Sequence, residues 1–426
     1  MRKAYTKIVF VVVGVLVALS LLIGGSVAFG QKVSLEFVFY GVGEEADVWK
    51  DFSKIFMRDN PEIAIEVIPV PANSWGEYFD KISIMIAGGT PPDMGRVAIE
   101  GVSLFITKGL VLPLDDYIER DKEELQPIFD DIHPRMLDCF RHEGKLYGVG
   151  LEWNNMVIHY NTKLFEKNGI ARPADDWDQS EFLTIAQKLN ADLDGDGRTD
   201  QYGYGLWNAY FAGSMPWIFN FGSNLLSDDW KESNANDPKV IAAMQWLQDL
   251  VWKYKVTPTP ATADVTNLFI SGKLGMMGGG RWPCLSFHNA GFFDYDIMYW
   301  PKVERQINEV GIGTIPIMAS SEHPEEAWKF LKYTLTKEAQ EYLGKLGWAM
   351  TSRRSVSYDA EIMSPPEHFR IYYDSLDNSI YVPSPPEYNI VENIWLRYLG
   401  LITANEMSAE EACKAAYREM SDVLGQ

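Results

Sequence analysis

The chain has 426 residues, of which 46% are hydrophobic, and 59 acidic against 38 basic side chains give a formal net charge of −21. An acidic surface repels nucleic acid and anionic lipid, so neither is an expected partner. Three scattered cysteines exclude a disulfide framework, and no Cys-x-x-Cys pair is present to bind zinc. The length exceeds one ordinary hydrophobic core and predicts two lobes or domains.

The first 30 residues have the features of a secretory signal. A basic start is followed by an apolar run over residues 8–23 and by small residues just before Gln31. This run is shorter than the roughly 20 residues that span a bilayer, although an uncleaved anchor is the alternative interpretation. We therefore expect the chain to be exported to the periplasm or another extracytoplasmic compartment.

Strands and helices alternate from the start of the expected mature chain. Residues 34–40 alternate like a strand, and residues 47–59 have helical spacing. Residues 63–70 and 75–87 repeat this strand–helix order, which predicts an α/β lobe with a largely parallel sheet. Later strands are expected at 145–149, 156–160 and 274–277, and later helices at 181–189, 239–254, 324–335, 337–346 and 408–424.

An acidic loop over residues 192–200 follows the spacing of an EF-hand. Oxygen ligands at positions 1, 3, 5, 7 and 9 are expected from Asp192, Asp194, Asp196, the Arg198 carbonyl and Asp200. Glycine stands at position six, where the sharp turn needs it, but also at position twelve, where EF-hands have a bidentate glutamate. The loop predicts a structural calcium ion without a part in chemistry, and a metal-free acidic turn is the alternative.

Five segments in order resemble the signatures of one family. They are residues 56–97, which contain Thr-Pro-Pro-Asp, residues 108–116, residues 145–165, residues 269–282 with Gly-Gly-Arg-Trp, and residues 323–331. Through them the chain resembles the extracellular solute-binding proteins of the maltose-binding type.

The resemblance implies a two-lobed periplasmic-binding-protein fold of type II. Each lobe would be a mostly parallel sheet flanked by helices, and hinge strands would let the lobes close on a ligand. By similarity, residues 31–148 with 301–345 would form the N-terminal lobe. Residues 149–300 with 346–426 would form the C-terminal lobe.

The function implied is that of a monomeric carbohydrate-binding receptor that delivers its ligand to the membrane permease of an ABC importer. No cofactor for chemistry is expected, because the chain lacks a nucleophile elbow, a zinc-protease motif, a P-loop and a dinucleotide fingerprint. One alternative is the same receptor for a polyol, a uronate oligomer, a glycerol-phosphate-like solute or a peptide. The other is a secreted glycoside-acting enzyme, which needs only two suitably placed carboxylates.

Matching the family's motifs gives three candidate ligand-binding residues outside the expected hinge. Glu100 follows Asp93 by seven residues, where the family has a sugar-contacting carboxylate. Tyr210 and Trp395 match positions of its stacking aromatics. The chain departs from the family at Val97, where an aromatic residue is usual, which argues against a long maltodextrin ligand.

Four further candidates lie near expected strand ends. Trp153 and Asn154 interrupt the crossing signature where the floor of the site is expected. Trp282 follows three glycines, whose small size lets a ligand approach the backbone, and Arg281 beside it is suited to bidentate hydrogen bonds. Trp348, near the hinge, is interpreted either as a core residue or as the rim of the site.

Overall fold

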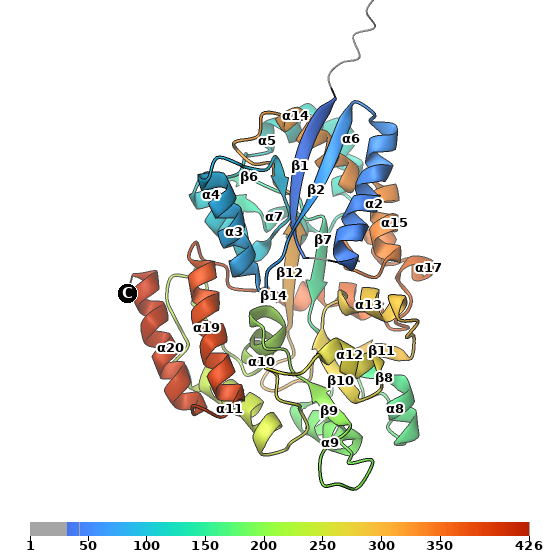
Figure 1. Cartoon of the computed structure of the whole chain (residues 1–426), viewed down its shortest axis with the longest axis vertical. Helices are drawn as coiled ribbons and strands as arrows, with labels where there is room; N and C mark the ends of the chain where they lie inside the picture. Colours follow the sequence, from blue (N-terminus) through green and yellow to red (C-terminus); the bar gives the residue numbers. More distant parts are fainter. Residues whose placement is uncertain (1–31, 42, 426) are drawn as a thin grey trace, which may run out of the picture.

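The computed structural model describes residues 32–41 and 43–425, so the expected signal over residues 1–30 lies outside the described part. Two α/β lobes lie on either side of a small central sheet (Figure 1). Within the described residues, no helix is long and apolar enough to cross a membrane.

The first lobe is built on a parallel sheet in the order β2-β1-β3. Its strands are β1 (Val33–Tyr40), β2 (Ile63–Val70) and β3 (Met94–Gly95). The main helices around it are α2 (Glu44–Asp59), α3 (Trp75–Ala87), α4 (Ile99–Thr107), α5 (Asp115–Arg120), α6 (Lys122–Phe129), α7 (Pro134–Asp138), α14 (Pro324–Thr334) and α15 (Lys337–Lys345).

The alternating residues of β1 explain why helices cover both faces of this sheet. The Phe37 ring packs edge-on against Trp49 of α2, with centroids 5.2 Å apart, and lies 6.0 Å from Phe330 of α14. On the other face, Val38 belongs to the buried cluster that includes Tyr78 and Phe79 of α3. Successive side chains of a strand point to opposite faces, so both helical layers are anchored by one strand.

The second lobe has a four-stranded sheet in the order β11-β8-β10-β9. Its strands are β8 (Val157–Asn161), β9 (Tyr202–Gly205), β10 (Leu274–Gly279) and β11 (Tyr295–Met298). Strands β9 and β10 are parallel, but β8 runs antiparallel to both of its neighbours. The expected α/β lobe is therefore confirmed, whereas its sheet is mixed because β8 enters directly from the central sheet.

Helices cover this second sheet and extend beside it. They are α8 (Thr162–Lys167), α9 (Gln179–Leu189), η1 (Tyr210–Ser214), α10 (Met215–Asn220), α11 (Pro238–Trp252), α12 (Val265–Ile270), α13 (Pro283–Asn289), α19 (Tyr388–Thr403) and α20 (Ala409–Leu424). Figure 1 shows α11, α19 and α20 together on one side of the lobe. Ser408 caps α20 through a hydrogen bond from the backbone N–H of Glu411.

The central sheet joins the lobes. Its strands are β4 (Val97–Ala98), β7 (Glu152–Asn155), β12 (Asn308–Thr314), β13 (Met350–Thr351) and β14 (Ser379–Tyr381). After it the chain forms α16 (Arg354–Ser357), α17 (Ala360–Met363), α18 (Arg370–Asp374) and η2 (Leu376–Asn378). The strand expected at residues 145–149 is shorter than predicted, since only β6 (Lys145–Leu146) pairs, with β5 (Arg141–His142).

Candidate functional site

One face of the central sheet carries polar side chains on one strand and glycines on its neighbour. Antiparallel pairing places Glu152 opposite Gly313 and Asn154 opposite Gly311. Directly opposed residues point to the same face, so these four share it, together with Glu309 two residues before Gly311. We call this surface the polar face.

The glycines of the polar face leave room for the groups that lie on it. A Cβ at position 313 would lie 2.0 Å from the Glu152 Oε1 atom, and one at 311 would lie 3.0 Å from the Phe211 ring. Larger residues at Gly311 or Gly313 would therefore displace neighbouring side chains.

The first lobe meets the polar face through Arg96. The guanidinium of this buried residue donates hydrogen bonds to Glu152 Oε1 from Nε (3.0 Å) and Nη2 (2.6 Å). It also lies between two indole rings, 4.9 Å from the centroid of Trp75 and 4.5 Å from that of Trp348. The Tyr40 ring stacks on Trp75 at 4.7 Å. Tyr40 ends β1 and Arg96 follows β3, so this group lies at the carboxyl ends of parallel strands, where α/β folds bind ligands.

The second lobe meets the same face through the turn after β10. The backbone N–H of Arg281 donates a hydrogen bond of 2.7 Å to Asn154 Oδ1. A Cβ at Gly280 would lie 2.2 Å from the Trp282 ring, so the indole covers this glycine's backbone. Trp282 and Phe211 are partly buried, with ring centroids 6.0 Å apart. An indole and an amide thus lie side by side at this end of the face.

Three buried glutamates surround the polar face. Glu100 lies in the first turn of α4, Glu309 on β12 and Glu392 on α19, and each is at most 3% exposed. Burial raises the pKa of Glu100 to about 8 and that of Glu309 well above its usual range. Glu100 Oε2 and both Glu309 carboxyl oxygens have no hydrogen-bond partner among the described residues. These oxygens keep hydrogen-bonding capacity for a polar molecule at this face.

Glu392 also links the two lobes. It accepts hydrogen bonds from the backbone N–H of Gly76 on α3 (2.7 Å) and from the hydroxyl of Tyr388 (2.9 Å). Asn389, also on α19, donates a hydrogen bond of 2.5 Å to Asp80 on α3. Burial raises the pKa of Glu392. The first and second lobes are thus in direct polar contact beside the polar face.

Comparison with known proteins identifies the family to which this chain belongs. The family model for bacterial extracellular solute-binding proteins matches residues 41–341. The chain belongs to this family.

Individual relatives have low sequence identity to this chain but align with most of its length. A binding protein of Brucella abortus is 26% identical over 348 residues, which are 76% of this chain and 77% of its own length. The maltotriose-binding protein of Pyrococcus abyssi is 22% identical over 300 residues, 68% of this chain and 60% of its own length. An ABC substrate-binding protein from Listeria monocytogenes, solved in complex with cycloalternan, superimposes with a TM-score of 0.82 at 23% identity. That superposition covers 92% of this chain and 99% of the other. The two-lobed binding-protein fold is therefore confirmed, and both family and fold are those of substrate-binding receptors.

Within this solute-binding protein, three sequence-predicted site residues lie at the polar face or its border. Asn154 and Trp282 lie on it, and the buried Glu100 is close enough to Glu309 to raise that residue's pKa further. All three stay predictions as ligand contacts.

Three aromatic residues that were predicted to contact the ligand are instead packed inside the protein. Trp153 points to the opposite face of the central sheet, because it alternates with Glu152 and Asn154, and its Nε1 donates to the Thr351 carbonyl at 3.0 Å. Tyr210 donates to the Pro383 carbonyl, and Trp395 donates to Ser214 Oγ at 2.8 Å. All are at most 1% exposed, so none presents a free ring face in this conformation.

The Arg281 side chain is also turned away from the polar face. It is fully buried, and its guanidinium contacts the Met363 sulfur (2.8 Å) and donates to the carbonyls of Gly344 and Met363. Only its backbone N–H reaches Asn154. The expected bidentate contact to a ligand is therefore not formed by this side-chain conformation.

Six residues on or beside the polar face were not predicted from the sequence. They are Trp75, Arg96, Glu152, Glu309, Gly311 and Gly313. The alternation of glycines at 311 and 313 was a usable signal, since glycine in a strand often marks a close approach. Nothing local showed that Arg96 and Glu152, which are 56 residues apart, form an ion pair.

A separate pocket of about 870 Å³ lies at the amino end of β1, away from the polar face. Its wall includes Arg120, Glu325 and Lys329. Arg120 pairs with Glu325, and Lys329 pairs with Glu62. These charged side chains form ion pairs with one another, and none of the sequence-predicted site residues lines the pocket.

The acidic loop over residues 192–200 brings three of its five predicted ligands together. Carboxylate oxygens of Asp192, Asp194 and Asp200 lie within 4.8 Å of one another. Asp196 accepts a hydrogen bond from the backbone N–H of Arg198 and is outside this group. Asp192 accepts from the N–H groups of Gly195 (2.7 Å) and Gly197 (2.8 Å), which closes the turn.

Proposed function

We propose that this protein is the carbohydrate-binding receptor of an ABC importer and that its ligand binds at the polar face. The observation that supports this most is the combination of indole rings with unpaired carboxyl oxygens around one face between two lobes. A sugar ring has an apolar C–H side that suits indole faces and hydroxyls that suit carboxyl and amide groups. Closure of the lobes would surround both sides of such a ring.

A neutral ligand fits the charges better than an anionic one. Arg96 is already paired with Glu152, and the Arg281 guanidinium is turned away from the face. The buried carboxyl groups around the face include those of Glu100, Glu309 and Glu392. Burial favours the protonated, neutral forms of Glu100 and Glu309, which can donate hydrogen bonds to sugar hydroxyls and accept them. Neither Arg96 nor Arg281 is free to balance a carboxylate or phosphate, so uronate oligomers and glycerol-phosphate-like solutes are disfavoured.

The relatives support the same class of ligand and the transport role. One is named for maltotriose and another was solved with cycloalternan, both of which are carbohydrates. We infer that this chain acts outside the cytoplasm after export by its N-terminal signal. There it works as a monomer that presents its closed, loaded form to a membrane permease.

A thermal-shift screen tests this function. The panel contains mono- and oligosaccharides, polyols, uronic acids, amino acids and oligopeptides, and each sugar is recovered and analysed for cleavage. A ligand that binds only the folded state raises the melting temperature. We expect one class of neutral sugar to do so and to be recovered unchanged. A shift with peptides alone would contradict the carbohydrate proposal, and cleaved sugar would indicate an enzyme.

We also propose that the loop over residues 192–200 binds a structural calcium ion. The convergence of Asp192, Asp194 and Asp200 supports this, because calcium prefers several carboxylate oxygens at one point. Calcium should raise the melting temperature of the wild type, and Asp194→Ala, which removes a ligand oxygen, should abolish that increase. An equal calcium effect in both proteins would contradict the site.

A further inference from the structure

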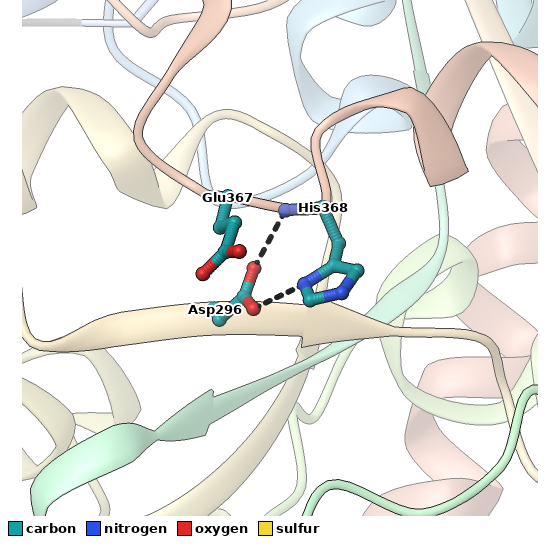
Figure 2. A group of neighbouring side chains, drawn as sticks. All are labelled: Asp296, Glu367 and His368. Atoms are coloured by element: carbon teal, nitrogen blue, oxygen red, sulfur yellow. Dashed lines mark hydrogen bonds and ion pairs between the residues drawn. The ribbon is translucent and has the colours of Figure 1, made fainter.

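Three metal-ligating side chains from two distant segments meet at the edge of the second-lobe sheet (Figure 2). Asp296 lies on the edge strand β11, whereas Glu367 and His368 lie between α17 and α18. One ligand atom from each of the three lies within 4.8 Å of the others. Figure 2 shows the three side chains directed toward one another.

Asp296 is held firmly in this group. It is only 3% exposed, and its Oδ1 accepts a hydrogen bond of 3.0 Å from the backbone N–H of His368. Its Oδ2 accepts from the Tyr160 hydroxyl at 3.2 Å and lies 2.5 Å from His368 Nδ1. Two donors therefore fix the orientation of the carboxylate, and an imidazole nitrogen lies against it.

The charges of this group are not balanced by a permanent cation. No lysine or arginine of the described chain forms an ion pair with Asp296 or Glu367, and the basic partner of Asp296 is His368 itself. Glu367 is exposed and adds a second carboxylate beside a buried one. Two carboxylates beside one imidazole give this group a net negative charge, which attracts a cation.

We propose that Asp296, Glu367 and His368 bind a divalent transition-metal ion of the zinc class. One imidazole nitrogen and two carboxylates are a common ligand set for such ions, and water would complete the coordination. On binding, the neutral imidazole would carry its proton on Nε2 and present Nδ1 to the metal. The Nδ1–Oδ2 separation would then open from 2.5 Å to about 3 Å, because both atoms would lie about 2 Å from one ion.

The bound ion would fasten a long connection to the second lobe. Just before the site, the Met363 carbonyl accepts from Arg281, whose backbone N–H reaches Asn154 on the polar face. Just after it, Tyr372 on α18 is 3.0 Å from His159 on β8 and donates to the Gly280 carbonyl. The metal would thus hold the segment that supports the back of the polar face, and it would do so whatever solute the receptor binds.

Zinc titration of the full, EDTA-treated and tag-free chain tests this site. Calorimetry should show one tight ion per chain, and zinc should raise the melting temperature. Glu367→Gln and His368→Gln should each weaken zinc binding by at least about tenfold, since even groups behind the ligands contribute 10- to 100-fold. Calcium and magnesium should bind this group more weakly than zinc, because both prefer all-oxygen ligands.

Two matched variants make the result specific. Glu361→Gln changes an exposed glutamate on α17 in the same segment and should bind zinc like the wild type. Asp194→Ala should also leave zinc binding unchanged, which separates this group from the acidic loop. Glu367 is exposed, so its variant should keep the metal-free melting temperature. Absence of zinc binding in the wild type, or unchanged binding in Glu367→Gln and His368→Gln, would overturn the proposal.

Discussion

Glu152 and Asn154 stand two residues apart on β7, point to the same face, and are each held by a different lobe. Glu152 accepts a hydrogen bond from the guanidinium of Arg96 in the first lobe. Asn154 accepts one from the backbone N–H of Arg281 in the second. A change in the angle between the lobes must alter at least one of these contacts. Strand β7 therefore carries one side-chain contact to each lobe.

Trp282→Ala should weaken sugar binding by about 2 kcal/mol or more, in the range of aromatic hot spots. The reason is that its indole covers Gly280 beside Asn154 and offers a flat apolar face. Calorimetric titration with the sugar that stabilises the wild type most checks this. Trp252→Ala, which removes a more exposed indole on α11, is the control and should leave affinity unchanged. Equal affinity of wild type and Trp282→Ala would remove Trp282 from the site.

Arg96→Met should destabilise the fold by about 3–5 kcal/mol, because it leaves the buried Glu152 carboxylate without its partner. Denaturant unfolding measures the loss. The double variant Arg96→Met with Glu152→Gln should recover part of it, since the unpaired charge is then absent. If the double variant were as unstable as the sum of both single variants, the two side chains would not be coupled.

Glu100→Gln should change how stability depends on pH. The pKa of Glu100 is raised from 4.5 to about 8, so the folded state keeps a proton that the unfolded state releases. This group's contribution is fully present below pH 4.5 and is lost as pH rises through about 8. The neutral amide of the variant does not titrate, so it loses no stability in this range. The melting temperature of the variant should therefore rise relative to that of the wild type between pH 5 and pH 8. A pH-independent difference would contradict the raised pKa.

Gly313→Ala should destabilise the protein by about 1–3 kcal/mol, as overpacking usually does. Its Cβ would lie 2.0 Å from Glu152 Oε1, and Arg96 holds that carboxylate in place. Gly400→Ala is a matched control on α19, where a Cβ meets no atom within 4 Å. It should be stabilising by about 0.5–1 kcal/mol, because glycine lowers helix stability. Thermal unfolding of the two variants should therefore shift in opposite directions.

The sequence predicted the fold more completely than the site. The β-α-β-α start predicted an α/β lobe, because hydrophobic periodicity is a local property of each helix and strand. The five ordered signatures predicted the two-lobed fold through their resemblance to a family. The direction of β8 was not predicted, because strand pairing depends on contacts between Ile158 and residues more than 100 positions away.

For the site, motif matching selected Asn154 and Trp282, which the structure places at the polar face, and also Trp153, which is next to Asn154 on the same strand and points to the opposite face. Alternation decides between them, since adjacent residues of β7 face opposite sides. The face that a strand turns toward the partner lobe is set by pairing with β12. That pairing joins segments about 150 residues apart, and no local pattern reveals it.

A crystal structure with the most stabilising neutral sugar tests the central claim most directly. We expect the sugar between the lobes on the polar face, with its ring against Trp282 and its hydroxyls within hydrogen-bond distance of Asn154 and of Glu100 or Glu309. A sugar bound elsewhere, with the polar face unchanged from the conformation described above, would contradict it.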